Sequence, residues 1–591
     1  MFGMIRIADP KHPYSGYLPY LLFFTVLFVF FAFFGNYILF IQEKSSLFIF
    51  SKEYLALNLA RPGSLLVYSG KLLASFFIFP VAGAVIVSLT LTLTAFLISR
   101  TLSVLTGNDS AFIPLMISAL LFYLQASYQY LYYNSLGLFL QAALFFLTIR
   151  YFKVWLPVII APAWYFITGS FAWIYIVMYL LYLVFFVRGK AWITASATVL
   201  IMVLFIVISR EFIFYHSARS LIIWPYSPDD IAGQQRLFIA AVLVIALLPA
   251  GAVLKIRLRI PKKIPPVVAK LAPSLLPLML VIVMAFFKYD NKTRRHATVE
   301  KMFYEGRYND IIAYNTKYPS NNILSLFLNN VALCETGRLN DMLFHFRQRP
   351  DGQTLFFKWE MLGEILKLGG YFYYTTGMIN EAHRWAFENM VMKGHTPEGL
   401  KMLIRTELIN GNYPMASKYI KLLRGTLFYR DEARAFDKLL FDDGAVLADP
   451  LLGPAKRDKL ETDFFVFTDD PYYNLTRAVS SEKANRNALD YLLAYCMLTE
   501  NFEVIAEKLP KLESYGFARI PVHLEEAAMA YSTMLQGRLP DTGSLLISNQ
   551  TIVRFNQFLQ TFQSFGNDRK SAEPALRQRF GNTFWYYAFY R

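Results

Sequence analysis

The chain has 591 residues, which is too long for a single hydrophobic core, so at least two domains are expected. Apolar residues make up 55% of the chain, a high share for a soluble protein. A formal charge of +16 would suggest nucleic acid as the partner of a soluble protein. Here much of the excess lies in short loops between apolar runs, which is typical of membrane topology, and we expect no nucleic-acid partner.

Acidic side chains are distributed very unevenly along the chain. Of its 42 Asp and Glu residues only seven precede residue 290, namely Asp9, Glu43, Glu53, Asp109, Glu211, Asp229 and Asp230. An ionised carboxylate at the centre of a bilayer costs about 2.5–3.5 kcal/mol, which explains its exclusion from membrane-embedded segments. We therefore predict an all-α protein with a transmembrane helix bundle over residues 1–288 and a soluble domain over residues 289–591.

Nine apolar segments follow one another in the predicted bundle. The first is longer than the roughly 7–15 apolar residues of a cleavable signal peptide and long enough to cross a ~30 Å hydrocarbon layer. The segments span residues 17–42, 72–99, 111–126, 130–149, 154–169, 171–187, 191–209, 237–254 and 268–287. Eight is the alternative number, because only Thr168, Gly169 and Ser170 separate the fifth segment from the sixth.

Lys and Arg in the short loops indicate how the bundle is oriented. With nine crossings, the side of the N-terminus holds twelve of these cations, and the opposite side holds seven in two longer loops. Cytoplasmic loops carry the excess of positive charge. We therefore expect a cytoplasmic N-terminus and a periplasmic domain after Lys288, in a bacterial inner membrane.

Two long outer loops, residues 43–71 and 210–236, hold five of the seven acidic residues of the bundle. Loop 43–71 begins with a carboxylate, continues with a stretch that can lie along the membrane interface, and ends in the turn Arg61-Pro62-Gly63. The acids, bases and aromatic residues of loop 210–236 can bind a phosphate together with a sugar or a peptide. The candidate substrate-binding residues are Glu53, Arg61, Arg210, Glu211, His216, Arg219, Asp229 and Asp230.

A repeated turn marks the second half of the chain. Gly306, Gly337, Gly377 and Gly411 each separate two amphipathic stretches, at intervals of 31, 40 and 34 residues. Glycine supplies the left-handed backbone of a tight helix–helix turn, and a small residue one turn later lets the paired helices approach. Over residues 295–540 this pattern resembles tetratricopeptide repeats, whose period is about 34 residues. A stack of irregular helical hairpins is the alternative.

Cysteine usage adds little to the functional prediction. The two cysteines, Cys334 and Cys496, both lie in helical patterns of the second half, and we expect two buried single thiols. Signatures of soluble enzymes are absent, including phosphate-binding glycine loops, metal-type His/Cys spacings and nucleophile elbows. The outer loops are therefore the expected place of any chemistry.

The acid-bearing first outer loop and the second long loop after the seventh segment resemble the GT-C superfamily of membrane glycosyltransferases and oligosaccharyltransferases. The resemblance implies transfer of a sugar or glycan from a polyprenyl-phosphate carrier to an acceptor on the outer leaflet. It implies that Glu43 is the catalytic acid of the first loop, as a general base or as a ligand of a divalent metal ion. It further implies that Arg210 or Arg219 holds the lipid-linked phosphate.

Two other functions remain open from the sequence. A membrane-anchored scaffold would use the repeats to hold partner proteins. A transporter is the third, although ionisable residues are nearly absent at mid-bilayer depth, where coupled transporters keep them. Structural roles are open too: Glu43 can anchor a helix end, the arginines can reach lipid head groups, and Asp229-Asp230 can cap the following helix.

Overall fold

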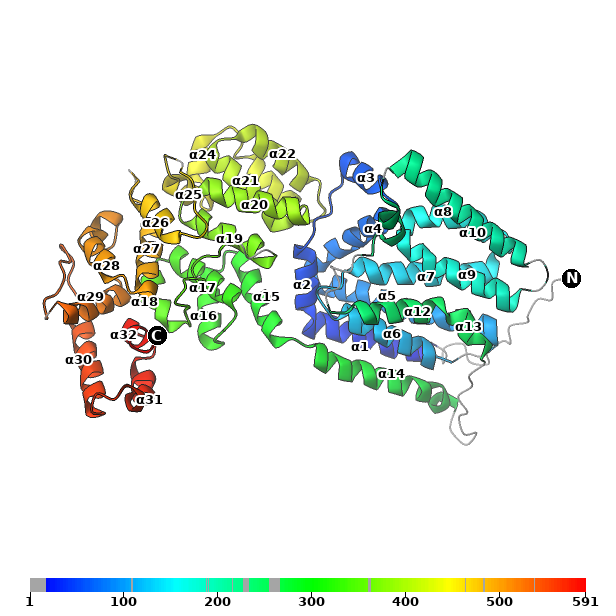
Figure 1. Cartoon of the computed structure of the whole chain (residues 1–591), viewed down its shortest axis with the longest axis horizontal. Helices are drawn as coiled ribbons and strands as arrows, with labels where there is room; N and C mark the ends of the chain where they lie inside the picture. The colour runs from blue at the N-terminus through cyan, green and yellow to red at the C-terminus, as the bar shows by residue number, and fades with distance from the viewer. Residues whose placement is uncertain are drawn as a thin grey trace. The chain divides into compact units, whose positions relative to one another are not determined.

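A computed structural model describes residues 17–107, 110–187, 189, 191–214, 216–226, 233–254, 266–359, 363–462, 464–481, 484–535 and 537–591. All regular structure in these ranges is helical, which confirms the predicted all-α class (Figure 1). The chain forms two compact units. The N-terminal unit comprises Met1–Asn291 with Gly425–Phe428, and the C-terminal unit comprises Lys292–Arg424 with Tyr429–Arg591.

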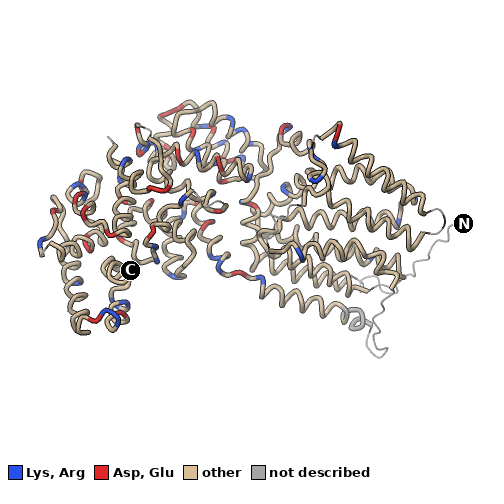
Figure 2. The backbone as a smooth tube through the Cα atoms, viewed as in Figure 1, with Lys and Arg blue, Asp and Glu red and all other residues tan. Residues whose placement is uncertain are grey.

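Apolar helices make up the N-terminal unit. α5 is its centre, because it packs against α1, α6, α7 and α13. Acidic side chains are sparse in this unit and frequent in the other (Figure 2). The helices are α1 (Leu18–Val29), η2 (Phe30–Phe34), α2 (Asn36–Lys44), α3 (Lys52–Leu59), α4 (Ser64–Ala74), η3 (Ser75–Ile78), α5 (Pro80–Thr106), α6 (Phe112–Gln125), α7 (Tyr132–Tyr151), α8 (Leu156–Thr168), η4 (Gly169–Phe171), α9 (Ala172–Phe186), α10 (Ala191–Ile208), η5 (Ser209–Phe214), α11 (Ala218–Ile223), α12 (Gln235–Ala246), α13 (Leu248–Val253) and α14 (Pro266–Lys288).

By length and composition, four helical stretches in the described residues can cross a membrane, or six if each of two bent helix pairs counts as one span. This is fewer than the nine predicted. The predicted segments 111–126 and 237–254 contain helices of only 14 and 12 residues, α6 and α12. The segments 154–169 and 171–187 count together as the 31-residue stretch Leu156–Phe186, because only η4 separates α8 from α9.

The first predicted segment is not one straight helix. It bends by 68° between Leu18–Phe34 and Asn36–Lys44. Gly35 lies at the bend, where the ring of Phe30 occupies the place that a Cβ would need, 2.7 Å away. Because of this bend, α2, which carries Glu43, runs in a different direction from α1.

Short helices make up the C-terminal unit. They pack mainly as sequential pairs, such as α16 with α17, α19 with α20, α20 with α21 and α21 with α22. The helices are α15 (Asn291–Tyr304), α16 (Tyr308–Lys317), α17 (Ile323–Glu335), α18 (Leu339–Met342), η7 (Leu343–His345), α19 (Glu364–Thr375), α20 (Ile379–Lys393), α21 (Pro397–Asn410), α22 (Tyr413–Arg424), α23 (Arg430–Asp437), α24 (Asp443–Ala448), α25 (Leu452–Asp458), α26 (Pro471–Val479), α27 (Arg486–Thr499), α28 (Phe502–Lys508), η8 (Leu509–Tyr515), α29 (Val522–Met534), α30 (Asn549–Ser564), α31 (Arg569–Phe580) and α32 (Phe584–Tyr590).

The predicted turn chemistry is present at all four glycines. Gly306, Gly337, Gly377 and Gly411 have φ values between 66° and 79°, a region that glycine reaches without strain. Each lies between the end of one helix and the start of the next. Ala382 and Ala416, the small residues after two of these turns, are fully buried. Cys334 and Cys496 are free and buried, as predicted.

Candidate functional site

Two segments predicted to lie in separate outer loops meet in the N-terminal unit. The Arg61 guanidinium lies over the Trp224 ring, with Cζ 3.9 Å from the ring centroid. Arg61 Nη2 donates a hydrogen bond of 2.5 Å to Ser220 Oγ, and Trp224 Nε1 donates one of 3.2 Å to Ser64 Oγ. We call this meeting of residues 61–64, 169–170 and 220–225 the loop junction.

Two glycines allow the three backbone segments of the loop junction to approach. Gly63 N–H donates to Phe166 O at 2.9 Å, and Ser170 N–H donates to Trp224 O at 2.8 Å. A Cβ on Gly169 would lie 2.4 Å from Trp224 O, and a Cβ on Gly63 would lie 2.8 Å from Gly169 Cα. Both glycines have positive φ, 57° and 81°. The junction therefore requires glycine at both positions.

Side chains from the surrounding helices donate hydrogen bonds to the carbonyls of Leu221, Ile222 and Pro225. The last carbonyls of a helix as short as α11 have no partners inside it. Tyr165 OH donates to Leu221 O at 2.5 Å, Trp173 Nε1 to Ile222 O at 3.2 Å, and Tyr133 OH to Pro225 O at 3.2 Å. These bonds fix the backbone that presents Ser220 and Trp224 to Arg61.

Among the residues that the structure describes, Arg61 has no acidic partner. Its Nε atom is buried without a hydrogen bond, and no described carboxylate lies within ion-pair distance of it. Desolvation lowers the pKa of Arg61, but a guanidinium stays charged at any physiological pH. The stacking of the guanidinium on Trp224 contributes about 0.5–2 kcal/mol and holds the guanidinium in place. The residue can accept an external anion.

An apolar groove of about 360 Å³ shares residues with the loop junction. α9, α12 and residues 222–226 line it, and Ser170 is its one hydroxyl side chain apart from Tyr226. The Tyr226 ring stacks on Phe238 at 5.1 Å between centroids. The lining includes Phe171, Trp173, Ile174, Ile222, Phe238 and Val242. Such a groove fits a hydrocarbon chain rather than a polar ligand.

Glu43 lies at the end of α2 and is 4% exposed. Its Oε2 is 3.4 Å from Lys44 Nζ. The adjacent Gln42 donates from Nε2 to Tyr130 O at 2.9 Å, and the Tyr130 ring is 5.9 Å from that of Phe238 in the groove. Glu43 is therefore linked to the groove through two intervening side chains, and it does not contact Arg61.

The other predicted site residues do not converge on the junction. Glu53 is exposed in the first turn of α3. Arg210 and Glu211 pair with each other, Nε to Oε1 at 3.3 Å, and both are 55% exposed. Arg219 is exposed and His216 half-buried, and neither makes a hydrogen bond or ion pair with the described residues. Asp229 and Asp230 lie outside the described residues.

The residues that the structure describes form no cluster that fits a divalent metal ion. Among the described residues, no three His, Cys, Asp or Glu side chains gather closely enough to hold one. The metal-ligand role that the resemblance implies for Glu43 therefore has no partner side chains in that part of the chain. The general-base role does not need them.

Sequence reasoning selected Arg61 but missed the residues that hold it. Gly169, Ser220 and Trp224 lie 108, 159 and 163 positions from Arg61, and no spacing rule connects them to it. One available signal was Gly169 in a three-residue link between two apolar segments. Another was the Trp-Pro pair at 224–225.

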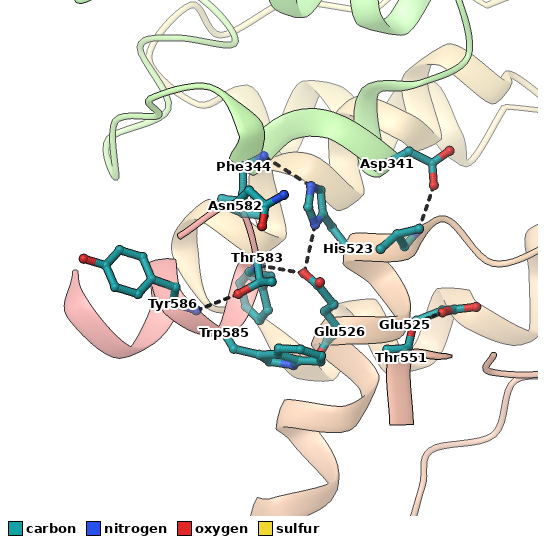
Figure 3. A network of polar contacts seen from close by, with 12 residues as sticks. Asp341, Phe344, His523, Glu525, Glu526, Thr551, Asn582, Thr583, Trp585 and Tyr586 are labelled. Atoms are coloured by element: carbon teal, nitrogen blue, oxygen red, sulfur yellow. Dashed lines mark hydrogen bonds and ion pairs between the residues drawn. The ribbon is translucent and has the colours of Figure 1, made fainter. Parts of the chain in front are cut away.

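The C-terminal unit contains a second buried polar cluster, between α29 and the end of the chain (Figure 3). His523 Nδ1 donates to Glu526 Oε2 at 2.9 Å, and His523 Nε2 accepts from Phe344 N–H at 3.3 Å. Glu526 Oε2 also accepts from Phe584 N–H at 2.7 Å, and its carbonyl accepts from Trp585 Nε1. Every member is satisfied and buried, so this cluster joins helices and leaves no group for a substrate.

Comparison with known proteins gives one result. A model described as "Family of unknown function (DUF6057)" matches residues 12–591. No curated protein and no solved structure matches the chain. Because that model spans nearly the whole sequence, the chain belongs to the family of unknown function DUF6057.

Proposed function

We propose that the N-terminal unit transfers a sugar or glycan from a polyprenyl-phosphate carrier to an acceptor at the outer leaflet. One observation carries the proposal: an arginine that has no acidic partner in the described part of the chain is held over Trp224 beside an apolar groove. A lipid-linked phosphate needs both features, a planar cationic fork for its oxygens and a dry surface for its chain. Arg61, rather than Arg210 or Arg219, is the phosphate-binding residue in this proposal.

The reaction divides between the phosphate site and Glu43. Glu43 takes the proton of an acceptor hydroxyl, and that oxygen attacks the anomeric carbon of the donor. The bond from this carbon to the phosphate oxygen breaks, and its electron pair stays on the phosphate, which Arg61 stabilises. The link from Gln42 through Tyr130 to Phe238 supports the placing of Glu43 near the donor.

The proposal includes a topology in which the chain crosses the membrane nine times. Residues 63, 133, 169 and 225 come together at the loop junction. They lie on one face of the membrane only if an even number of crossings separates each from the next. In this topology the chain crosses the membrane and returns once in each of the pairs α5–α6, α7–α8 and α9–α10. The contact between α8 and α9 is consistent with two consecutive crossings on either side of residue 169 (Figure 1). Helices shorter than a full span cross where the bilayer thins or the helix ends are extended by neighbouring turns.

The proposal is tested with the full-length protein in lipid nanodiscs. We expect Arg61→Met to weaken binding of undecaprenyl phosphate roughly 10- to 100-fold, because a hydrogen bond to a charged group contributes about 1.5–3 kcal/mol. Arg219→Met is the matched control, since Arg219 is an exposed arginine of the other outer loop and directly precedes Ser220. Glu43→Gln should leave binding unchanged and abolish glycan transfer in cells. Equal binding by the two arginine variants would contradict the phosphate site.

A scaffold is the second candidate function. The four hairpin turns with the same left-handed glycine favour it, because stacked helical hairpins commonly hold partner proteins. In a scaffold, residues 295–540, which resemble tetratricopeptide repeats, would recruit a partner protein in the periplasm. The two functions differ in one result: a pure scaffold keeps its cellular function when Arg61 and Glu43 are both replaced.

A further inference from the structure

Buried cations in the C-terminal unit are paired with carboxylates as a rule. Lys367, 10% exposed, lies 2.6 Å from Glu300 Oε1 and 2.7 Å from Glu364 Oε2. Lys401, 7% exposed, lies 2.9 Å from Glu398 Oε1 and 3.2 Å from Glu432 Oε2. This arrangement is expected, because a charge removed from water costs several kcal/mol unless it is paired.

Arg405 of α21 departs from this rule. It makes no hydrogen bond or ion pair with the residues that the structure describes, and its Nε atom is buried without a partner. Glu398 interacts with it electrostatically, but Oε1 of that carboxylate is taken by Lys401. A guanidinium cannot escape the cost by deprotonation. Its donors are therefore left for an acceptor outside the described chain.

Three tyrosines interact electrostatically with the Arg405 guanidinium, namely Tyr371 and Tyr374 of α19 and Tyr308 of α16. The Tyr374 hydroxyl is buried and has no hydrogen-bond partner. Burial raises the pKa of Tyr374, so its hydroxyl stays protonated and can donate. The Tyr371 ring is held edge-on to Phe303, 4.8 Å between centroids, within the same group of helices.

Both unmet groups at this place can donate a hydrogen bond, and two different helices, α21 and α19, supply them. We propose that Arg405 and Tyr374 form an oxyanion-binding site for a carboxylate or phosphate group of a ligand. The guanidinium fork takes two oxygens, and the Tyr374 hydroxyl adds a third bond. The site is separate from the loop junction and does not depend on the transferase proposal.

Calorimetric titration of the purified full-length protein tests the site. The probes are inorganic phosphate and a tetraglutamate peptide, each against sodium chloride at equal ionic strength. We expect saturable binding of at least one probe, a loss of tenfold or more in Arg405→Met, and a smaller loss in Tyr374→Phe. Arg384→Met on α20 is the control, because its side chain is 46% exposed, and it should bind as the native chain does. Binding of phosphate alone or of the peptide alone would identify the oxyanion.

Thermal unfolding in a buffer free of multivalent anions checks that the variants are folded. Because the half-buried Arg405 makes no hydrogen bond or ion pair with the described residues, its replacement should leave the unfolding temperature of Arg405→Met unchanged or higher. A clear fall would mean that Arg405 has a structural partner, and the proposal would be wrong. So would the absence of binding by both probes, or equal binding by the native chain and Arg405→Met.

Discussion

Asp490 is a buried carboxylate that the chain satisfies only in part. It lies on α27 and is 2% exposed. Its Oδ1 accepts from Asn340 Nδ2 at 2.7 Å, and its Oδ2 is buried without a partner. Burial raises the pKa of Asp490 from 3.8 to about 6, against the opposing effect of the Asn340 bond. The residue thus penalises the folded state when it is ionised.

The sign of the pH effect follows from linkage. Between pH 4 and 6 the folded state holds a proton that the unfolded state has released, so folding stability falls as the pH rises through this window. The shift corresponds to about 3 kcal/mol, at about 1.36 kcal/mol per pKa unit. We expect Asp490→Asn to increase the free energy of unfolding at pH 7.5 by an amount up to that figure and to flatten the dependence between pH 4 and 6.

The two cysteines give a measurement confined to the C-terminal unit. Both are buried there, so the urea concentration at which they react with a pyridyl disulfide reports unfolding of this unit at each pH. Asp431→Asn, at a side chain that is 90% exposed, is the control and should follow the native chain. An Asp490→Asn variant with the native pH dependence would show that Asp490 ionises at its ordinary pH.

At the scale of elements, one side chain attaches the final helix, α32, to α29. The Glu526 carboxylate accepts the N–H of Phe584 at the start of α32, and His523 Nδ1 supplies its second donor (Figure 3). Both donors bond the same oxygen, so Glu526→Ala removes the acceptor of both and leaves two buried N–H groups unpaired, at about 1–3 kcal/mol each. We expect faster hydrogen exchange over residues 584–590 with little change in α19 or α20. Glu573→Ala, at an exposed position of α31, should leave the exchange unchanged.

Elements differ in how far the sequence predicts them. The hairpin turns at Gly377 and Gly411 were predictable, because a positive φ is a local demand that glycine meets within four residues. Helix lengths were not. Segment 237–254 is apolar throughout, yet α12 ends at Ala246 and α13 begins at Leu248, since hydropathy does not mark where a helix ends inside an apolar run.

The loop junction shows why the candidate site was only half predictable. Arg61 was identifiable as a cation in a turn, but its partner Trp224 lies 163 positions away. The contact depends on Gly63 and Gly169 lying so close together that a Cβ on Gly63 would be 2.8 Å from Gly169 Cα, and this is a property of the folded bundle. Its acidic residues distinguish loop 210–236 in the sequence. The groove beside it is lined by ordinary apolar side chains, which the sequence does not distinguish from the rest of the bundle.

At the scale of the whole molecule, helix length and loop contacts give different crossing numbers. Six spans would return the chain after Lys288 to the side of the N-terminus, and nine would place it on the opposite side. Single cysteines introduced into a background without Cys334 and Cys496 distinguish the two. If α5–α6, α7–α8 and α9–α10 are crossing pairs, residues 107, 153 and 189 face one compartment and residues 60, 129 and 233 face the other.

We therefore expect an impermeant maleimide added outside intact cells to label residues 60, 129 and 233 and to spare residues 107, 153 and 189. The reason is geometric: Tyr133 reaches Pro225, and Gly169 lies against Gly63, which is possible only if their connections share a face. A position in the exposed α22, such as Lys418, should label with the first group if nine crossings are correct. Labelling of residue 153 from outside would break the pairing of α7 with α8. Protection of residue 418 would put the C-terminal unit in the cytoplasm, out of reach of any outer-leaflet acceptor.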